Sequence, residues 1–491
     1  MFGLMMRRGL AAFVAATGIA TAAAAQTVAP AAPAGRPNVS TSWHWTVNNM
    51  TRLESWSFFE PRPGGGDPES TFVGNRLRVG LTRSWPRVDF SAALQYVQFA
   101  GLPTHAVGPG AFGAGALYFD GSGSTTSHQV YPRVLSVRLK LPAGVTVDAG
   151  RFGYTSGAEA PSGEGKIEAV KRARLDSRLI GDFEWSLYQR SYDGARADVD
   201  RKPWHLTGTW LRPTQGGYKS AAGRSLGDVN VGAVTLTLRP GTLVPRTDVA
   251  PFVYRYDDSR DVAARPDNTG RPASRVDVGI TTLGASAVGA APIGSGEADW
   301  FGWFAGQTGD WYGQLHRAWS FSTEAGYQWK SARWQPWLRG GHLAASGDSN
   351  PADNRHGTFF LMIPTVRRYS YTTVYAPTNL EDTFAELVLR PSARATLRAD
   401  VRRLALSDAA DRWYSGSGAT AAHGTFFGFA ARPSTGFTDL GRVAEGSADV
   451  RLGPHWAVNG FLGSIEGGQV VKALFARSSL RYLYLENVIQ F

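Results

Sequence analysis

The chain has 491 residues, no cysteine, 58 glycines and 12% aromatic residues, with a formal net charge of +11 and a slightly negative mean hydropathy. The missing cysteines exclude a secreted fold held by disulfides, and after residue 26 no run of about 18 apolar residues could form a membrane-spanning helix. A soluble exported protein or a β-barrel remains, and the high glycine and aromatic content favours the barrel.

The first 25 residues have the features of an export signal. Arg7 and Arg8 precede an apolar run over residues 9–20, and Ala23-Ala24-Ala25 offers a cleavage site before Gln26. A membrane anchor is the alternative, but about a dozen apolar residues fall short of the roughly 20 needed to cross a bilayer. We therefore predict a signal peptide over 1–25, a flexible periplasmic segment over 26–40 and one barrel domain over 41–491.

From residue 43 onward, apolar and polar side chains alternate in segments of about ten residues, separated by Gly, Pro, Asp or Asn clusters. In residues 134–141, Leu135, Val137, Leu139 and Leu141 oppose a serine, an arginine and a lysine. Similar alternation over 76–81, 179–190, 395–402 and 447–452 predicts strands there too. Because side chains alternate across a strand, each segment has one face for lipid and one for water.

Strands that cross lipid must close into a barrel, since hydrocarbon leaves no partner for an unpaired backbone group. The final residues 483–491 alternate in the same way and end on Phe491, as bacterial barrel proteins characteristically do. The sequence therefore predicts an all-β fold, a transmembrane antiparallel up-and-down β-barrel of about 18 strands, with 16 as the alternative. Two groups of tryptophans are predicted to form interfacial girdles: Trp300, Trp303 and Trp311, and Trp329, Trp334 and Trp337.

Residues 346–364, SGDSNPADNRHGTFFLMIP, resemble the outer-membrane alginate export family. In that family a strand ends in Ser-Gly-Asp, and Gly-Thr-Phe then leads to a Pro-containing apolar stretch. The family pattern continues through Asn379-Leu380, Pro391, Asp411 and Trp413-Tyr414, while Gly150-Arg151 and residues 178–194 give further matches. The resemblance thins between about residues 198 and 299, which are richer in Gly, Pro and Ala than continuous strands would be.

This resemblance implies an 18-stranded barrel, an arginine-rich constriction that passes a polyuronate, and a periplasmic loop that can occlude the pore. Strand parity predicts that seven cations face the lumen: Arg76, Arg78, Arg138, Lys140, Arg398, Arg402 and Arg451. Arg151 and Arg190 lie in the family-like segments and are assigned to the same solute path. Arginine suits carboxylate binding because its planar guanidinium group stays charged and donates two parallel hydrogen bonds to a carboxylate.

A structural reading of these cations stays open, because predicted inward acids such as Asp400 and Glu445 can pair with them and hold the wall rigid. Arg367 and Arg368 are predicted to lie in a loop that touches lipopolysaccharide phosphates. The acidic loop around Asp348 and Asp353 offers oxygen ligands for calcium but lacks the EF-hand spacing, so no metal site is assigned.

Other function classes lack support in the sequence. There is no cysteine nucleophile and no recognisable hydrolase motif around the nine histidines, so we expect no enzyme activity and no cofactor. A 22-stranded plugged transporter needs a longer chain. A purely structural or adhesive barrel remains an alternative, and it would conduct no ions.

We therefore expect a monomeric channel in the outer membrane of a Gram-negative bacterium that passes an anionic, alginate-like saccharide. A general or uptake porin for small anions and sugars is the alternative. The expected partners are outer-membrane lipid and lipopolysaccharide, the barrel assembly machinery and periplasmic export proteins, and no nucleic acid.

Overall fold

The computed structural model describes residues 42–107, 114–218, 221–365, 370, 372, 374–416 and 418–491. The predicted signal peptide and periplasmic segment, and the loop arginines Arg367 and Arg368, lie outside the described residues. Those three predictions therefore stay predictions.

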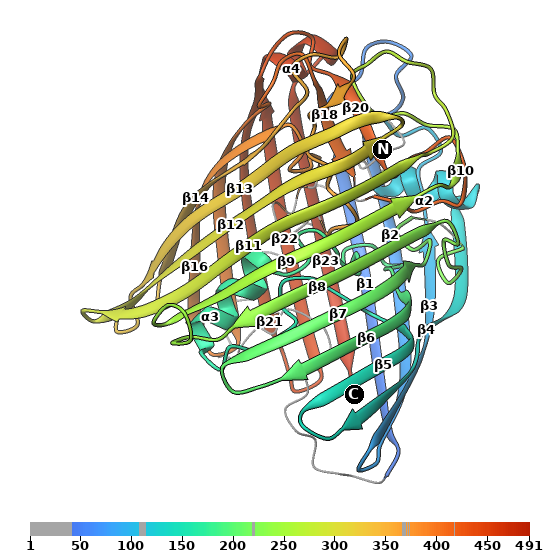
Figure 1. The fold of residues 1–491 in the computed structure, drawn as a ribbon. Helices are drawn as coiled ribbons and strands as arrows, with labels where there is room; N and C mark the ends of the chain where they lie inside the picture. Colours follow the sequence, from blue (N-terminus) through green and yellow to red (C-terminus); the bar gives the residue numbers. More distant parts are fainter. Residues whose placement is uncertain are drawn as a thin grey trace.

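The described chain forms a closed antiparallel barrel of 18 strands, so the predicted fold class is confirmed and the 16-strand alternative is wrong (Figure 1). Each strand pairs with the next along the chain, and the first pairs with the last, Asn48 opposite Gln490 and Ser57 opposite Arg481. The barrel strands are β1 (His44–Ser57), β2 (Glu69–Ser84), β3 (Val88–Ala100), β4 (Thr126–Leu141), β5 (Val145–Phe152), β6 (Tyr192–Asp200), β7 (Trp204–Pro213), β8 (Val229–Leu238), β9 (Thr247–Asp258), β11 (Val278–Ile293), β12 (Gly296–Trp311), β13 (Gln314–Gln328), β14 (Trp337–Ala345), β16 (Leu380–Ser392), β17 (Ala395–Ala405), β21 (Asp439–Arg451), β22 (Trp456–Gly467) and β23 (Ser479–Gln490).

Shorter elements lie in the connections between these strands. They are the helices α2 (Ala114–Ser122), α3 (Gly165–Val170) and α4 (Gln469–Leu474), the π-helical turn η1 (Lys171–Leu175), and the strands β10 (Asp261–Val262), β15 (Arg355–His356), β18 (Arg412–Gly416), β19 (His423–Gly424) and β20 (Phe429–Pro433). None of the helices in the described part of the chain is long and apolar enough to cross a membrane.

The two ends of the barrel differ in the length of their connections (Figure 1). Turns of two to eight residues join the strands at the end where β1 begins and β23 finishes, whereas long loops with α2, α4, β18 and β20 close the other end. Short turns are periplasmic and long loops extracellular in outer-membrane barrels. Among the described residues no connection at that end is longer than eight residues, so the occluding periplasmic loop implied by the resemblance is not found there.

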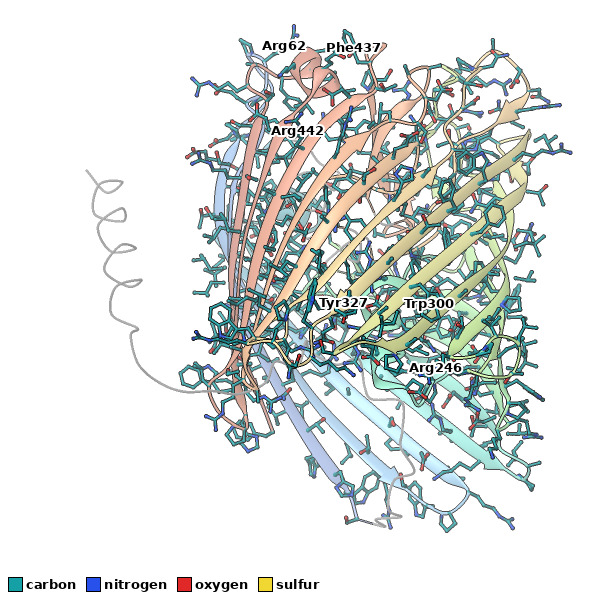
Figure 2. All side chains as sticks on the ribbon, turned by 90° about the vertical axis from the view of Figure 1, so that its left-hand side faces the viewer. Arg62, Arg246, Trp300, Tyr327, Phe437 and Arg442 are labelled. Carbon is teal, nitrogen blue, oxygen red and sulfur yellow. The ribbon has the colours of Figure 1, made fainter. Side chains whose placement is uncertain are left out.

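Exposed aliphatic side chains cover the outside of the wall (Figure 2). Leu135, Leu139 and Leu141 on β4 are 43–55% exposed, and Val401 on β17 is 58% exposed. Their neighbours Arg138 and Arg402 point to the other face, so the alternation predicted for these strands is confirmed. The strand predicted at the carboxyl end also holds, with Leu485 exposed and Tyr484 buried on the lumen side.

The strand predicted over residues 179–190 is wrong. These residues belong to a long connection between β5 and β6, residues 153–191, which we call the inner loop. Phe183 and Gln189 have φ angles of 53° and 56°, values outside the strand region of backbone space. Conversely, the Gly-rich region from residue 198 to residue 299 does form strands, from β7 to β12.

The inner loop lies inside the barrel, because it contacts inward side chains from several parts of the wall. The Arg52 guanidinium on β1 donates to the carbonyl of Trp185, and the Gln95 amide on β3 donates to that of Tyr188. On the far side of the ring, Lys171 reaches Asp248 on β9. These contacts place the loop across the lumen.

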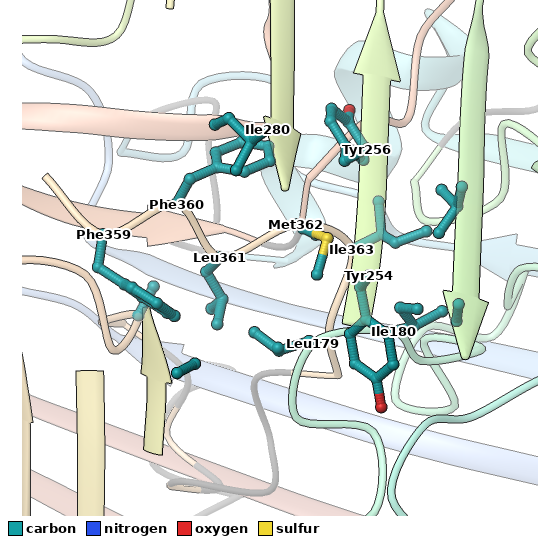
Figure 3. Packing of buried hydrophobic residues seen from close by; sticks show 14 of the residues in the cluster. Leu179, Ile180, Tyr254, Tyr256, Ile280, Phe359, Phe360, Leu361, Met362 and Ile363 are labelled. Atoms are coloured by element: carbon teal, nitrogen blue, oxygen red, sulfur yellow. The ribbon is translucent and has the colours of Figure 1, made fainter. Parts of the chain in front are cut away.

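A second segment meets the inner loop there. It belongs to the connection between β14 and β16, which starts at the Ser346-Gly347-Asp348 turn and which we call the SGD loop. Ile180 and Ile363 form a β-bridge, in which Ile363 donates its N–H to Leu179 and accepts one from Gly181. Phe360, Met362 and other apolar side chains pack around the bridge against β9 and β11 (Figure 3). The hydrophobic core of the molecule therefore lies within the lumen.

This core changes the assignment of half of the predicted aromatic girdle. Trp303, Trp311 and Trp337 are at most 5% exposed and face the lumen, so their girdle assignment is wrong. Trp329 and Trp334 are about 40% exposed in the periplasmic turn between β13 and β14, as the prediction requires. Trp303, Trp311 and Trp337 pack against the segments inside the lumen. An aromatic side chain is stabilised by burial there as it would be at the membrane interface.

The exposed aliphatic band predicts a cost of lipid-facing charge that depends on depth. Leu485→Arg, near the middle of β23, should destabilise the barrel by about 2–4 kcal/mol, whereas Leu452→Arg, beside a periplasmic turn, should cost about 0–1 kcal/mol. Reversible denaturant unfolding in lipid vesicles measures both values. Equal costs at the two positions would contradict the assigned lipid face.

Candidate functional site: the charged lumen

The inner loop is tied to the wall by buried ion pairs. Arg174 lies 2.8 Å from Glu324 on β13, and Arg339 on β14 lies 3.0 Å from the same carboxylate. Lys171 lies 3.1 Å from Asp248. Since an unpaired buried charge costs far more than a paired one, these contacts fix the loop in position.

The wall from β16 to β21 carries a balanced network of charges. Arg398 lies 2.7 Å from Glu386, and Arg402 lies 2.7 Å from Asp382 and 2.9 Å from Asp400. The Arg402 side chain is fully buried. Both arginines face the lumen as predicted, and both form ion pairs with carboxylates of the wall, as the structural interpretation of these cations requires.

The wall from β2 to β4 is different, because two of its cations have no acidic partner. Arg78 donates to the amide oxygens of Gln95 and Gln189, and Arg76 donates to Asn48 at 3.3 Å. Within the described residues no carboxylate lies within 4.0 Å of either guanidinium. These two predicted lumen residues therefore keep an uncompensated positive charge.

Two more predicted cations stand on the same wall, nearer the periplasmic turns. Arg138 makes a two-pronged ion pair with Asp148 at 2.7 and 3.0 Å, and Lys140 lies 2.6 Å from Asp89. Arg138 keeps 36% of its side chain exposed although it faces inward, so solvent reaches the periplasmic part of the lumen. We call Lys140, Arg138, Arg78 and Arg76 the cation wall.

Arg133 belongs beside this wall, although sequence parity places it outside. Its guanidinium donates to Ser191 at 2.6 Å and to Asp182 at 3.1 Å, and it is 3% exposed. The β3–β4 register shifts next to Ala93, so an extra residue turns Arg133 inward relative to Leu135. A bulge of this kind leaves no signal in a simple alternating pattern.

The remaining predicted cations are scattered. Arg451 faces inward at the periplasmic end of β21, and Arg190 is fully buried in the inner loop, where it donates to the carbonyl of Ala419 at 2.9 Å. Arg151 contradicts the lumen prediction: it stands opposite Leu135 in the register and therefore faces outward, paired with Asp193 at 2.7 Å. The assignment of Arg151 to the solute path rests on its place in a family-like segment, and such a match does not indicate which face of the strand a side chain is on.

The acidic loop lies at the extracellular end. Asp348 accepts an N–H from Asn350, and Asp353 accepts one from Arg355. Burial, reinforced by nearby Asp411, raises the pKa of Asp348 to about 6, so the carboxyl is partly protonated near neutral pH. Across the described ranges, no three His, Cys, Asp or Glu side chains gather to hold a metal.

Comparison with known proteins agrees with this architecture. Residues 170–478 match the model of the alginate export family. No curated protein sequence matches the chain significantly. Among solved structures, the chain is similar to Pseudomonas aeruginosa OccK9 (OpdG), with a TM-score of 0.56, 12% identity and coverage of 91% of this chain and 98% of the other. Acinetobacter baumannii OccAB2 gives a TM-score of 0.56 at 7% identity, and P. aeruginosa OccK8 (OprE) 0.54 at 10%, with the same coverages.

At these identities the solved structures speak for the fold alone, whereas the family match spans more than half of the chain. The closed barrel and its charged lumen agree with that family match. The protein therefore belongs to the alginate export family and is a channel of the outer membrane.

Proposed function

We propose that the channel passes anionic saccharides and that Arg76 and Arg78 bind their carboxylates. The observation that supports this proposal is the uncompensated charge of these two residues. Arg138, Arg398 and Arg402 on the lumen face of the wall already have acidic partners, and Arg451 lies apart at the periplasmic end of β21. A guanidinium without a carboxylate partner keeps its donors for an anionic solute.

The surroundings of the two arginines suit a sugar acid. Gln95, Gln189 and Asn48 place amide groups beside the guanidinium groups, and amides can exchange hydrogen bonds with sugar hydroxyls. Lys140 and Arg138 stand on the same wall toward the periplasm. Several cations of moderate strength along one path allow a solute to bind and leave again, which conduction requires.

A porin for small anions and sugars is the second candidate, and the packed lumen favours it. Arg76 is only 2% exposed beneath the inner loop, so a polymer reaches it only if the loop moves. A small anion needs less space and can approach the half-buried Arg78 from the periplasmic side. In both cases we expect diffusion through a monomer without a chemical step or cofactor, after signal-peptide cleavage and insertion by the assembly machinery of a Gram-negative envelope.

Removing the unpaired charge tests the proposal. Arg78→Gln should lower the anion-to-cation permeability ratio by about fivefold, because one unit charge near the path contributes about 1 kcal/mol. The reversal potential of single channels in a salt gradient measures this ratio.

The matched control removes a paired charge together with its partner. The double variant Arg138→Gln/Asp148→Asn keeps the net charge of the wall, so its reversal potential should equal that of the unaltered protein. If the double variant lost selectivity and Arg78→Gln kept it, the unpaired charge of Arg78 would not set the selectivity.

Removing the inner loop tests what limits the current. Replacing residues 156–189 with a short Gly-Ser linker should raise single-channel conductance several-fold, because an 18-stranded barrel without lumen segments leaves a water-filled pore. Deleting the exposed residues 270–274 between β9 and β11 should leave conductance unchanged. An unchanged current after inner-loop removal would show that the constriction lies elsewhere.

A further inference from the structure

Three exposed arginines stand on the outer face of the barrel at its extracellular end. They are Arg403 on β17, Arg442 on β21 and Arg481 on β23. Arg403 shares its face with lipid-exposed Val401, and Arg481 shares its face with Leu485. Figure 2 shows Arg442 below Phe437 toward the end with the long loops, with Trp300 and Arg246 farther from that end.

Arg403 and Arg442 lie directly opposite each other in the β17–β21 register. Like charges in such a cross-strand pair repel, so a sheet gains nothing from this arrangement by itself. In the described part of the chain, neither side chain nor that of Arg481 makes a hydrogen bond or an ion pair. A bound anion would remove the repulsion.

Acidic side chains near this patch do not neutralise it. Glu466 stands opposite Arg442 on β22, and Glu381 lies diagonal to Arg403, yet among the described residues neither forms an ion pair with an arginine. An open hollow of about 400 Å³ adjoins the patch and is lined by Glu466, Lys472, Phe475 and Arg477. Lys472 adds a cation there, whereas Arg477 is paired with Glu60 at 3.2 Å.

Two outward arginines elsewhere on the same rim have acidic partners. Arg151 binds Asp193, and Arg255 binds Asp257. Arg317 on β13 is outward and, among the described residues, unpaired as well. The sector from β17 to β23 differs in that two unpaired arginines, Arg403 and Arg442, stand directly opposite each other there.

The depth of the patch identifies the ligand class. Val401 and Leu462, both 58% exposed, lie on the periplasmic side of the arginines and face the acyl chains. The arginines then stand at the level of the headgroups of the outer leaflet, where the lipid carries phosphates on a sugar backbone. Arginine binds phosphate through two parallel N–H donors.

We propose that Arg403, Arg442 and Arg481 form a binding site for the phosphorylated sugar headgroup of lipopolysaccharide. The headgroup phosphate lies between Arg403 and Arg442, and the hollow with Lys472 accepts an adjoining part of the saccharide. This site is separate from the lumen and does not depend on which solute the channel passes.

Thermal unfolding of the purified full-length protein in detergent, with and without lipopolysaccharide, tests the site. The unaltered protein should unfold at a higher temperature with lipopolysaccharide, and Arg403→Gln/Arg442→Gln should lose most of that increase. The control Arg246→Gln/Arg333→Gln removes two exposed charges at the periplasmic rim and should keep it.

Two ligand controls separate the sources of phosphate. Dephosphorylated lipopolysaccharide and inorganic phosphate at the same phosphate concentration should each give little or no increase. An equal increase in the Arg403/Arg442 variant, or with the dephosphorylated lipid, would overturn the proposal. An equal increase with inorganic phosphate would overturn it too, because the patch would then bind a soluble anion.

Discussion

The pairing of every backbone polar group in the membrane is the constraint on which this structure depends. Hydrocarbon offers no hydrogen-bond partner, so the ladder of strands must close, and here β23 pairs with β1 over ten residue pairs. Closure makes the wall two-sided. Aliphatic side chains such as Leu135 and Val401 cover the lipid face, so at the depth of the hydrocarbon arginines and acids point into the lumen.

A wide lumen creates a second problem, which the inner loop and the SGD loop solve. Their apolar residues pack together through Ile180 and Ile363, while inner-loop cations such as Arg174 bind wall acids such as Glu324. Most charged side chains in the lumen therefore form ion pairs that hold the structure together. Within the described residues, Arg76 and Arg78 have no acidic partner, so their charge remains available to a solute. The same reasoning applies on the outer face to Arg403 and Arg442.

The sequence predicts the wall better than it predicts the lumen. Alternation locates strands such as β4 and β17 because each strand meets lipid on one face and water on the other. It fails over residues 179–190, where a loop inside the lumen is buried on all sides, and at Arg133, where a bulge shifts the parity. Ion pairing is invisible because the partners are far apart in the chain: Arg174 and Glu324 are separated by 150 residues. Parity thus places Arg398 and Arg78 in the lumen equally, although only Arg78 lacks an acidic partner.

The central claim is that the cations of the lumen recognise a charged saccharide. Current block of single wild-type channels in planar bilayers tests it most directly, with an oligouronate compared against a neutral oligosaccharide of equal length. The account predicts concentration-dependent block by the oligouronate, weakened at high salt, and much weaker block by the neutral sugar. Equal block by both sugars, or none by the oligouronate, would contradict the claim.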